Sequence, residues 1–264
     1  MPTRQERRRQ ERLAKKKLGY RQWADGKGKE KQYNLNVELI QPWSVPVFKT
    51  TLPPEILQTM IEISDQVIAD KETKSHGEYL AGQIEKELLV EHNILEQTGV
   101  LGFFMGAVRQ FVIMCKCQMM PDKIDVIQRE EWLTQMLSIW VVSQYPNEYN
   151  PAHIHTDCAI STVMYLKVPE MLPSRKSERD DDGCIVFIGS AAPENRFTRQ
   201  QLKVKPVPGD FFMFPAHQIH AVYPFRTKDG KGERRSVSFN ADFMSKQAYE
   251  DENHPENRMS SAHA

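Results

Sequence analysis

Short apolar runs separated by turn-forming residues fill the second half of this 264-residue chain, and they constrain its fold more than any other feature. Pairs such as Pro208-Gly209 and Asp229-Gly230 stand between the runs. Because Gly and Pro favour turns and interrupt regular structure, each run reads as a strand. The sequence predicts strands over residues 137–144, 158–167, 184–188, 202–206, 210–214, 219–223 and 234–243. Several short strands at this spacing are typical of a β-sandwich or barrel.

Residues 33–136 follow a mainly helical pattern instead, after a segment over residues 40–52 that looks extended. An amphipathic helix is expected to begin at Pro53-Pro54, because proline suits the first turn of a helix and apolar side chains then recur at helical spacing. A second helix is expected within residues 84–96, and a third over about 100–118. The third segment is apolar nearly all round, so we expect it to be buried. The sequence thus predicts a helical region that supports the strand-rich part.

The formal net charge of zero hides a basic segment attached to an acidic body. Residues 1–32 carry 12 Lys and Arg against 4 Asp and Glu, which leaves 23 basic and 31 acidic residues in the rest of the chain. With little apolar surface to bury, residues 1–32 are predicted to be a disordered basic arm, and residues 244–264 a polar tail. The arm has two interpretations, a nucleic-acid-binding segment or a solubilising or partner-docking tail.

Neither a secretory leader nor a membrane span is expected. The first thirty residues are too charged for a leader, and no apolar run approaches the roughly 20 residues that a span needs. The four cysteines lack the spacing of a small disulfide scaffold. We therefore expect a cytoplasmic protein with reduced thiols and no membrane partner.

The clearest chemistry lies in the strand-rich half. His155 and Asp157 form a His-x-Asp pair, and His220 follows 63 residues after Asp157. On an extended segment, residues two apart point to the same side. Two imidazoles and a carboxylate leave three adjacent positions of an iron ion open, which suits a bidentate oxo-acid and O₂. The sequence therefore predicts iron at His155, Asp157 and His220.

A second candidate group begins 14 residues after His220. Arg234, Ser236 and Ser238 share one face of the expected strand, whereas Arg235 points to the other. A guanidinium and a hydroxyl on one face suit a carboxylate ligand. The pattern thus favours Arg234 over Arg235 as the carboxylate-binding arginine.

These motifs resemble the Fe(II)/2-oxoglutarate-dependent dioxygenase family, most closely its prolyl-hydroxylase-like branch and uncharacterised, partly phage-associated relatives. The resemblance covers about residues 137–243 and is carried by Tyr145–Asp157, Ser161–Leu166, Gly209–Pro215, His220 and Arg234-x-Ser236. It implies an α+β, mainly β fold, with a double-stranded β-helix (jelly-roll) core over 137–243 and supporting helices before it. It also implies that His155, Asp157 and His220 are the iron ligands.

The resemblance further implies an activity and the residues that serve it. Arg234 and Ser236 would bind the distal carboxylate of 2-oxoglutarate, with Tyr165 as a hydroxyl donor, and Tyr145 would face the active site. The expected cofactors are Fe(II), 2-oxoglutarate and O₂, with ascorbate as a stimulatory reductant. The expected reaction hydroxylates a C–H bond of a peptidyl or other substrate and releases succinate and CO₂. A protein or peptide is the favoured partner.

Three alternatives stay open. His153 creates a His-x-His-x-Asp run, in which His153 and His155 would be ligands and Asp157 would lie beside them. A cupin-like metalloenzyme would use His153, His155 and His220 without an oxo-acid, and would release no succinate. A non-catalytic nucleic-acid-binding protein would rely on residues 1–32.

Overall fold

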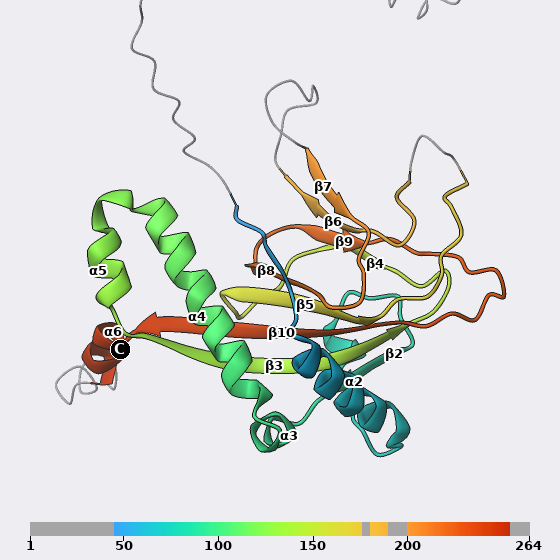
Figure 1. Cartoon of the computed structure of the whole chain (residues 1–264), viewed down its shortest axis with the longest axis horizontal. Coiled ribbons are helices and arrows are strands. Elements are labelled where there is room, and N and C mark those ends of the chain that lie inside the picture. The colour runs from blue at the N-terminus through green and yellow to red at the C-terminus, as the bar shows by residue number, and fades with distance from the viewer. Residues whose placement is uncertain (1–44, 176–179, 190–199, 254–264) are drawn as a thin grey trace, which may run out of the picture. The chain divides into compact units, whose positions relative to one another are not determined.

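The structure is a computed structural model that describes residues 45–175, 180–189 and 200–253 (Figure 1). The basic arm expected over residues 1–32 and the second half of the tail expected after residue 243 lie outside the described residues. The chain divides into two units, Met1–Trp43 and Ser44–Ala264, and every element named below belongs to the second.

Two antiparallel sheets form the centre of this second unit (Figure 1). The larger sheet has six strands in the order β1-β8-β5-β10-β3-β2, and the smaller has four in the order β4-β9-β6-β7. The bounds in the larger sheet are β1 (Phe48–Thr51), β8 (Asp210–Pro215), β5 (Ile160–Lys167), β10 (Arg234–Ser245), β3 (Trp132–Gln144) and β2 (Lys86–Leu89). Those in the smaller sheet are β4 (Asn150–His153), β9 (His220–Val222), β6 (Ile185–Ile188) and β7 (Gln201–Val204). The expectation of a mixed fold dominated by antiparallel strands is confirmed.

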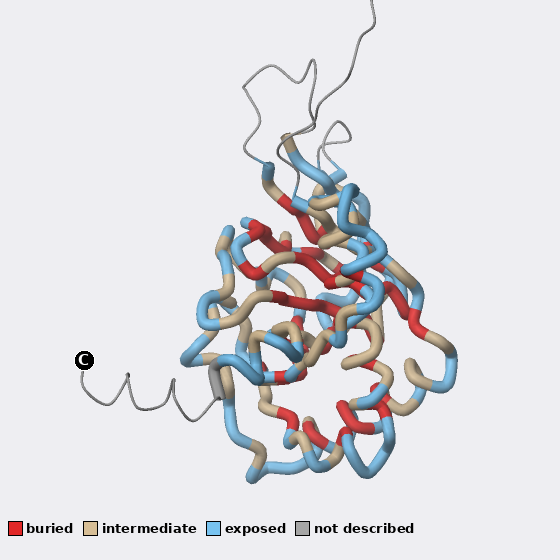
Figure 2. The backbone as a smooth tube through the Cα atoms, turned by 90° about the vertical axis from the view of Figure 1, so that its left-hand side faces the viewer, coloured by how far each residue is buried: buried red, intermediate tan, exposed pale blue. Residues whose placement is uncertain are grey.

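Alternating side chains build one core on each side of the larger sheet. On β5, Met164 and Leu166 belong to a core shared with the helices, whereas Val163 and Tyr165 belong to a core shared with β6 and β9. Because successive side chains point to opposite faces, a strand covered on both faces is apolar throughout. The buried stretches accordingly follow the strands through the interior (Figure 2).

Helices cover the other face of the larger sheet. Side chains of α2 (Pro54–Ala69), α3 (His92–Gln97) and α4 (Val100–Met119) belong to the core on this face. The described chain also contains α5 (Ile124–Arg129), α6 (Lys246–Asn253) and the 3-10 turns η1 (Gly77–Tyr79) and η2 (Pro121–Lys123). The buried ring of Phe104 on α4 lies 5.8 Å from that of Phe211 and 5.4 Å from that of Phe239. The helices α2, α3 and α4 therefore support the sheet from the side opposite to the smaller sheet.

The helix expected over residues 100–118 is confirmed as α4, but its burial is only partial. One side of it places five side chains in the core: Val100, Phe104, Val108, Phe111 and Val112. By length and composition alone, α4 is long and apolar enough to cross a membrane, contrary to the expectation that no apolar run approaches that length. It is the one such helix among the described residues. Its packing against the sheet accounts for five of its apolar positions.

Two segments differ from expectation. The helix expected within residues 84–96 is wrong over its first part, because Lys86–Leu89 form β2 and α3 begins only at His92. Hydrogen bonding to β3, a partner distant in sequence, overrides the local apolar spacing there. The region 33–136 thus contributes β1 and β2 to the larger sheet as well as helices. The second difference is the unexpected strand β4, which ends at His153.

Candidate metal and oxo-acid site

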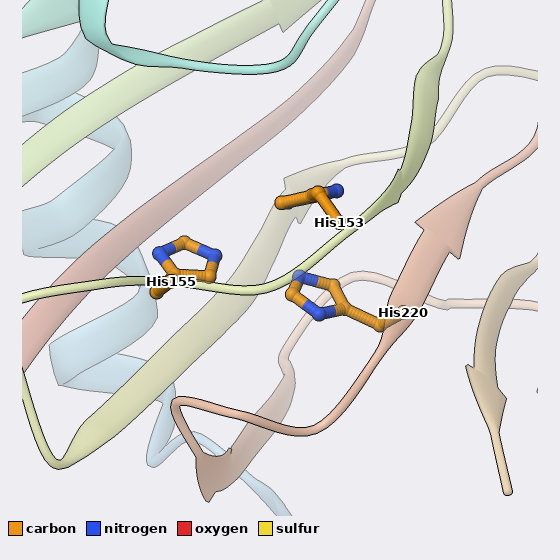
Figure 3. Close-up of side chains that lie close together, drawn as sticks. All are labelled: His153, His155 and His220. Atoms are coloured by element: carbon orange, nitrogen blue, oxygen red, sulfur yellow. The ribbon is translucent and has the colours of Figure 1, made fainter. Parts of the chain in front are cut away.

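Three imidazoles meet where β4 and β9 approach the larger sheet (Figure 3). The potential ligand atoms of His153, His155 and His220 all lie within 4.8 Å of one another. Their ring centroids are 4.2 Å apart for His153 and His220, 5.2 Å for His155 and His220, and 5.3 Å for His153 and His155. Such convergence allows the three rings to share one ion.

Strand pairing brings these distant histidines together. β4 pairs with β9 so that His153 stands opposite His220. His155 lies just beyond β4, where its backbone N–H donates to the carbonyl of Ala216 over 2.9 Å. The segment from β4 to His155 is therefore held along β9 and the turn before it.

The histidines have the protonation state that a metal requires. Nδ1 of His153 donates to the carbonyl of Pro151 (2.7 Å), and Nδ1 of His220 donates to the carbonyl of Gln218 (2.9 Å). Burial lowers the pKa of His153, lowers that of His155 to about 4 and lowers that of His220 to about 3. The rings are therefore neutral at pH 7. With Nδ1–H engaged, the Nε2 lone pairs of His153 and His220 are free to bind a metal.

Asp157 lies outside this cluster of three imidazoles. It is exposed, and its φ of 58° falls in the left-handed region that aspartate tolerates better than most residues. The prediction that His155 and Asp157 point to the same side assumes an extended strand. Because β4 ends at His153, this alternation of side chains does not extend as far as Asp157. Asp157 does line the same cavity as the imidazoles, and its role as a ligand stays a prediction.

The two adjacent arginines of β10 point to opposite faces, as alternation predicts. The Arg235 guanidinium pairs with Asp65 on α2 and, over 2.8 Å, with Glu233, and it also donates to Ser64 over 3.1 Å. Arg234 instead points toward the side of the smaller sheet. Arg235 thus ties β10 to α2, which leaves Arg234 as the candidate for a ligand.

Arg234 is a buried cation without an acidic partner among the described residues. It is 1% exposed, and it donates to the carbonyl of Gly183 over 2.6 Å and to Oε1 of Gln144. Its guanidinium carbon lies 5.2 Å from the centre of the Phe225 ring. A buried charge is costly unless it is paired, so an anionic ligand would complete this site.

Tyr165 and Ser236 lie beside Arg234 as cross-strand partners on β5 and β10. The Tyr165 hydroxyl is buried and has no hydrogen-bond partner. Burial raises the pKa of Tyr165 to about 12, so this hydroxyl stays protonated and can donate. Its ring centre lies 5.8 Å from the Arg234 guanidinium carbon. A guanidinium and an unused hydroxyl suit one carboxylate.

Tyr145 lies apart from these residues. It is half exposed, its backbone N–H donates to Glu148 over 2.6 Å, and its side chain does not line the cavity that holds the imidazoles. The expected place of Tyr145 at the active site stays a prediction.

A cavity of about 390 Å³ joins the imidazoles to Tyr165 and Ser236. Arg234 does not line this cavity, but Tyr165 and Gln144, which contact it, do. The cavity also contains residues that the sequence analysis did not single out, notably Glu87 and Trp140. Period two along β3 could have indicated Trp140. The local pattern gives no signal for Glu87, because it predicts a helix where the chain forms β2.

The fold and the site define a class of protein. Neutral imidazoles at this spacing fit Fe(II), and an unpaired buried guanidinium beside a free hydroxyl fits the distal carboxylate of an oxo-acid. The class is a metal-dependent enzyme with an anionic cosubstrate.

The strand-rich part of the chain matches one family model. Residues 138–240 match the family model described as "Putative 2OG-Fe(II) oxygenase". This match agrees with the resemblance of the motifs, and that family uses Fe(II), 2-oxoglutarate and O₂. No curated protein matches the sequence.

Several solved structures are similar to this chain. A prolyl-4-hydroxylase from Pseudomonas putida has 15% identity and a TM-score of 0.42, with 74% of this chain and 91% of that chain covered. A viral collagen prolyl hydroxylase from Paramecium Bursaria Chlorella virus-1, in complex with 2OG, has 14% identity and a TM-score of 0.41, with 74% and 94% covered. A prolyl hydroxylase from Trichoplax adhaerens has 11% identity and a TM-score of 0.43, with 75% and 82% covered.

Proposed function

We propose that this protein hydroxylates a C–H bond of a substrate in an Fe(II)- and 2-oxoglutarate-dependent reaction. The observation that carries the proposal is that one cavity is lined both by the cluster of neutral imidazoles and by the free Tyr165 hydroxyl, which lies beside the buried Arg234. We also infer that the two antiparallel sheets form a double-stranded β-helix, which the sheet order and the shared core support.

For the iron ligands, the geometry favours His153, His155 and His220. All three imidazoles converge, and the carbonyl groups that accept from Nδ1 of His153 and His220 orient two of the rings. Such carbonyl partners commonly accompany metal-binding histidines. Sequence spacing instead predicts a set of ligands in which Asp157 replaces His153. Substitution of His153 and of Asp157 would distinguish the two sets of ligands.

Arg234, Tyr165 and Ser236 would hold 2-oxoglutarate by its distal carboxylate. Arg234 offsets the negative charge, the Tyr165 hydroxyl donates a hydrogen bond, and Ser236 lines the cavity next to Tyr165 in the sheet register. Gln144 and Gly183 fix the guanidinium plane by accepting from its two terminal nitrogens.

When bound, Fe(II) and 2-oxoglutarate supply the oxidising chemistry, which consumes O₂ and releases succinate and CO₂ as the substrate is hydroxylated. The chain's own residues position that chemistry. The imidazoles remain neutral at pH 7 because burial disfavours their charged forms. Phe214, Val163 and Ile185 line the cavity and restrict water around the reacting groups.

The substrate is proposed to be a residue of a protein or peptide. The resemblance to the prolyl-hydroxylase-like branch supports this proposal, and one of the similar structures is described as a complex with a peptide fragment. Ascorbate is proposed to stimulate turnover by keeping the iron reduced.

The three-histidine geometry also suits a cupin-like metalloenzyme without an oxo-acid, so one experiment must separate the two functions. Protein loaded with Fe(II) is incubated with 2-oxoglutarate and O₂, and succinate is measured by mass spectrometry. The proposed function predicts slow, uncoupled succinate formation that Arg234→Ala abolishes at low 2-oxoglutarate. A protein that binds iron but forms no succinate would be the cupin-like enzyme.

A further inference from the structure

A buried carboxylate stands at the edge of the cavity, away from the proposed metal and oxo-acid residues. Glu87 lies on β2 opposite Val142 of β3, and Val142 lies opposite Ser236 of β10. Glu87, Val142 and Ser236 all line the cavity, so this row runs across the sheet toward Tyr165. Glu87 does not belong to the imidazole cluster, so it is not needed as a metal ligand.

Glu87 lacks the partner that a buried carboxylate normally has. The residue is 2% exposed, and its Oε2 atom is buried without any hydrogen-bond donor. Among the described residues, no lysine or arginine lines the cavity, and the charge that acts on Glu87 is the like charge of Glu148. Burial, and then Glu148, raise the pKa of Glu87 to about 7. A cation that enters the cavity would supply the missing partner.

The backbone at Gly82 packs directly against the side chains of Glu87 and Asn150. A Cβ atom added at Gly82 would lie 2.4 Å from Oδ1 of Asn150 and 2.7 Å from Oε1 of Glu87. Only glycine therefore lets the segment before β2 pass this close to both side chains. Asn150 also lines the cavity, so two acceptor oxygens converge there from different sheets.

Aromatic rings lead from the surface to the imidazoles along the same wall. Tyr79 is 74% exposed, its ring centre lies 5.5 Å from that of His76, and His76 lies 5.2 Å from Trp140. The ring of Trp140 in turn stacks against that of His155, with the ring centres 6.0 Å apart. Burial lowers the pKa of His76, so its ring is neutral at pH 7 and does not repel a cation. Aromatic faces attract ammonium and guanidinium groups.

We propose that this part of the cavity is a substrate subsite for a cationic nitrogen group, an amine or guanidinium, which donates hydrogen bonds to Glu87 and passes over the Tyr79, His76 and Trp140 rings. The subsite rests on the proposed function for its role, because it would orient a basic substrate toward the imidazoles. Its ability to bind a cation does not depend on iron or 2-oxoglutarate.

The test is calorimetric binding of four small probes to the full-length protein. Acetyl-arginine amide and acetyl-lysine amide carry the cation, whereas acetyl-citrulline amide and acetyl-norleucine amide have similar shapes without it. Each is titrated into the protein alone, and again into protein loaded with Fe(II) and 2-oxoglutarate without oxygen. We expect at least one cationic probe to bind roughly tenfold or more tightly than its neutral counterpart, as a charge-assisted hydrogen bond implies.

Two matched variants test whether Glu87 causes the preference for cationic probes. Glu87→Gln keeps the shape and removes the charge, so it should abolish the preference for the cationic probe. Glu85→Gln makes the same change at an exposed carboxylate two residues away that does not line the cavity, and it should keep the preference. Thermal melting of both variants confirms that they are folded.

Several outcomes overturn the subsite. These are equal binding of charged and neutral probes, a preference that survives Glu87→Gln, or no binding of any probe. Failure of the proposed function would be observed separately. Wild-type protein would then form no succinate from 2-oxoglutarate, whether or not the probes bind.

Discussion

Two residues, His153 and Asp157, are candidates for the third metal ligand, and they differ in position and exposure. If three imidazoles bind the ion, His153→Ala should weaken Fe(II) binding by at least about 100-fold, more than the 10- to 100-fold loss typical of a partner that only orients a ligand. Asp157→Ala should then change the affinity little, because Asp157 is exposed and outside the cluster. Co(II) absorption titrations of both variants would measure this. The opposite ranking would restore the ligand set that the sequence spacing predicts.

Arg234 and Arg235 are adjacent, but their substitution should have different consequences. Arg234→Ala should raise the dissociation constant for 2-oxoglutarate about ten- to 150-fold, because one charge-assisted hydrogen bond contributes roughly 1.5–3 kcal/mol. Arg235→Ala should leave that constant nearly unchanged and lower the melting temperature, because Arg235 joins β10 to Asp65 on α2. Anaerobic binding titrations and thermal melts on both variants check this. Equal losses of 2-oxoglutarate affinity would contradict the assignment of strand faces.

At the scale of elements, the edge strand β2 carries the buried Glu87, whose effect on the stability of the folded protein depends on pH. The pKa of Glu87 is raised from 4.5 to about 7 in the folded protein. The folded chain therefore binds more protons than the unfolded chain between these values. The contribution of Glu87 to stability is present below about pH 4.5 and is lost as the pH rises to about 7.

Glu87→Gln should remove this pH dependence. Its melting temperature should be close to that of the wild type at pH 5 and higher by a few degrees at pH 8, since about 1 kcal/mol corresponds to roughly 2–4 °C for a domain of this size. The lowered histidine pKa values act in the opposite direction, but both proteins share them, so they cancel in the difference. Glu85→Gln serves as the control and should show no such trend. A difference that is constant from pH 5 to pH 8 would argue against a buried, unpaired carboxyl.

At the scale of the whole molecule, the basic segment of residues 1–32 carries a prediction of its own, although it lies outside the described residues. If it binds nucleic acid, the full-length protein should do so with a steep salt dependence, and a chain that begins at Tyr33 should lose most of the binding. Five phosphate contacts would give a log–log slope of about −4.5. Gel shifts of both proteins at several salt concentrations measure the slope. Equally weak binding by the two would leave the segment as a solubilising or partner-docking tail.

The sequence predicted the parts of the molecule that local pattern controls. The buried helix α4 and the strands β3, β5, β8 and β10 follow from periodicity and turn residues, and alternation alone separated Arg234 from Arg235. Pairing between distant segments could not be read in this way. It turns Lys86–Leu89 into a strand, and it brings His153 opposite His220, neither of which leaves a local signal. The candidate third imidazole and the buried Glu87 both depend on such pairing.

The proposed function requires one cavity to bind both Fe(II) and 2-oxoglutarate. An anaerobic titration of the full-length protein, followed by visible absorption, tests this in a single measurement. We expect the weak charge-transfer band of the Fe(II)–2-oxoglutarate chelate only when both are present, and its loss in His220→Ala. In Arg234→Ala the band should require a much higher 2-oxoglutarate concentration. A wild-type protein that gives no band at saturating concentrations of both would contradict the central claim.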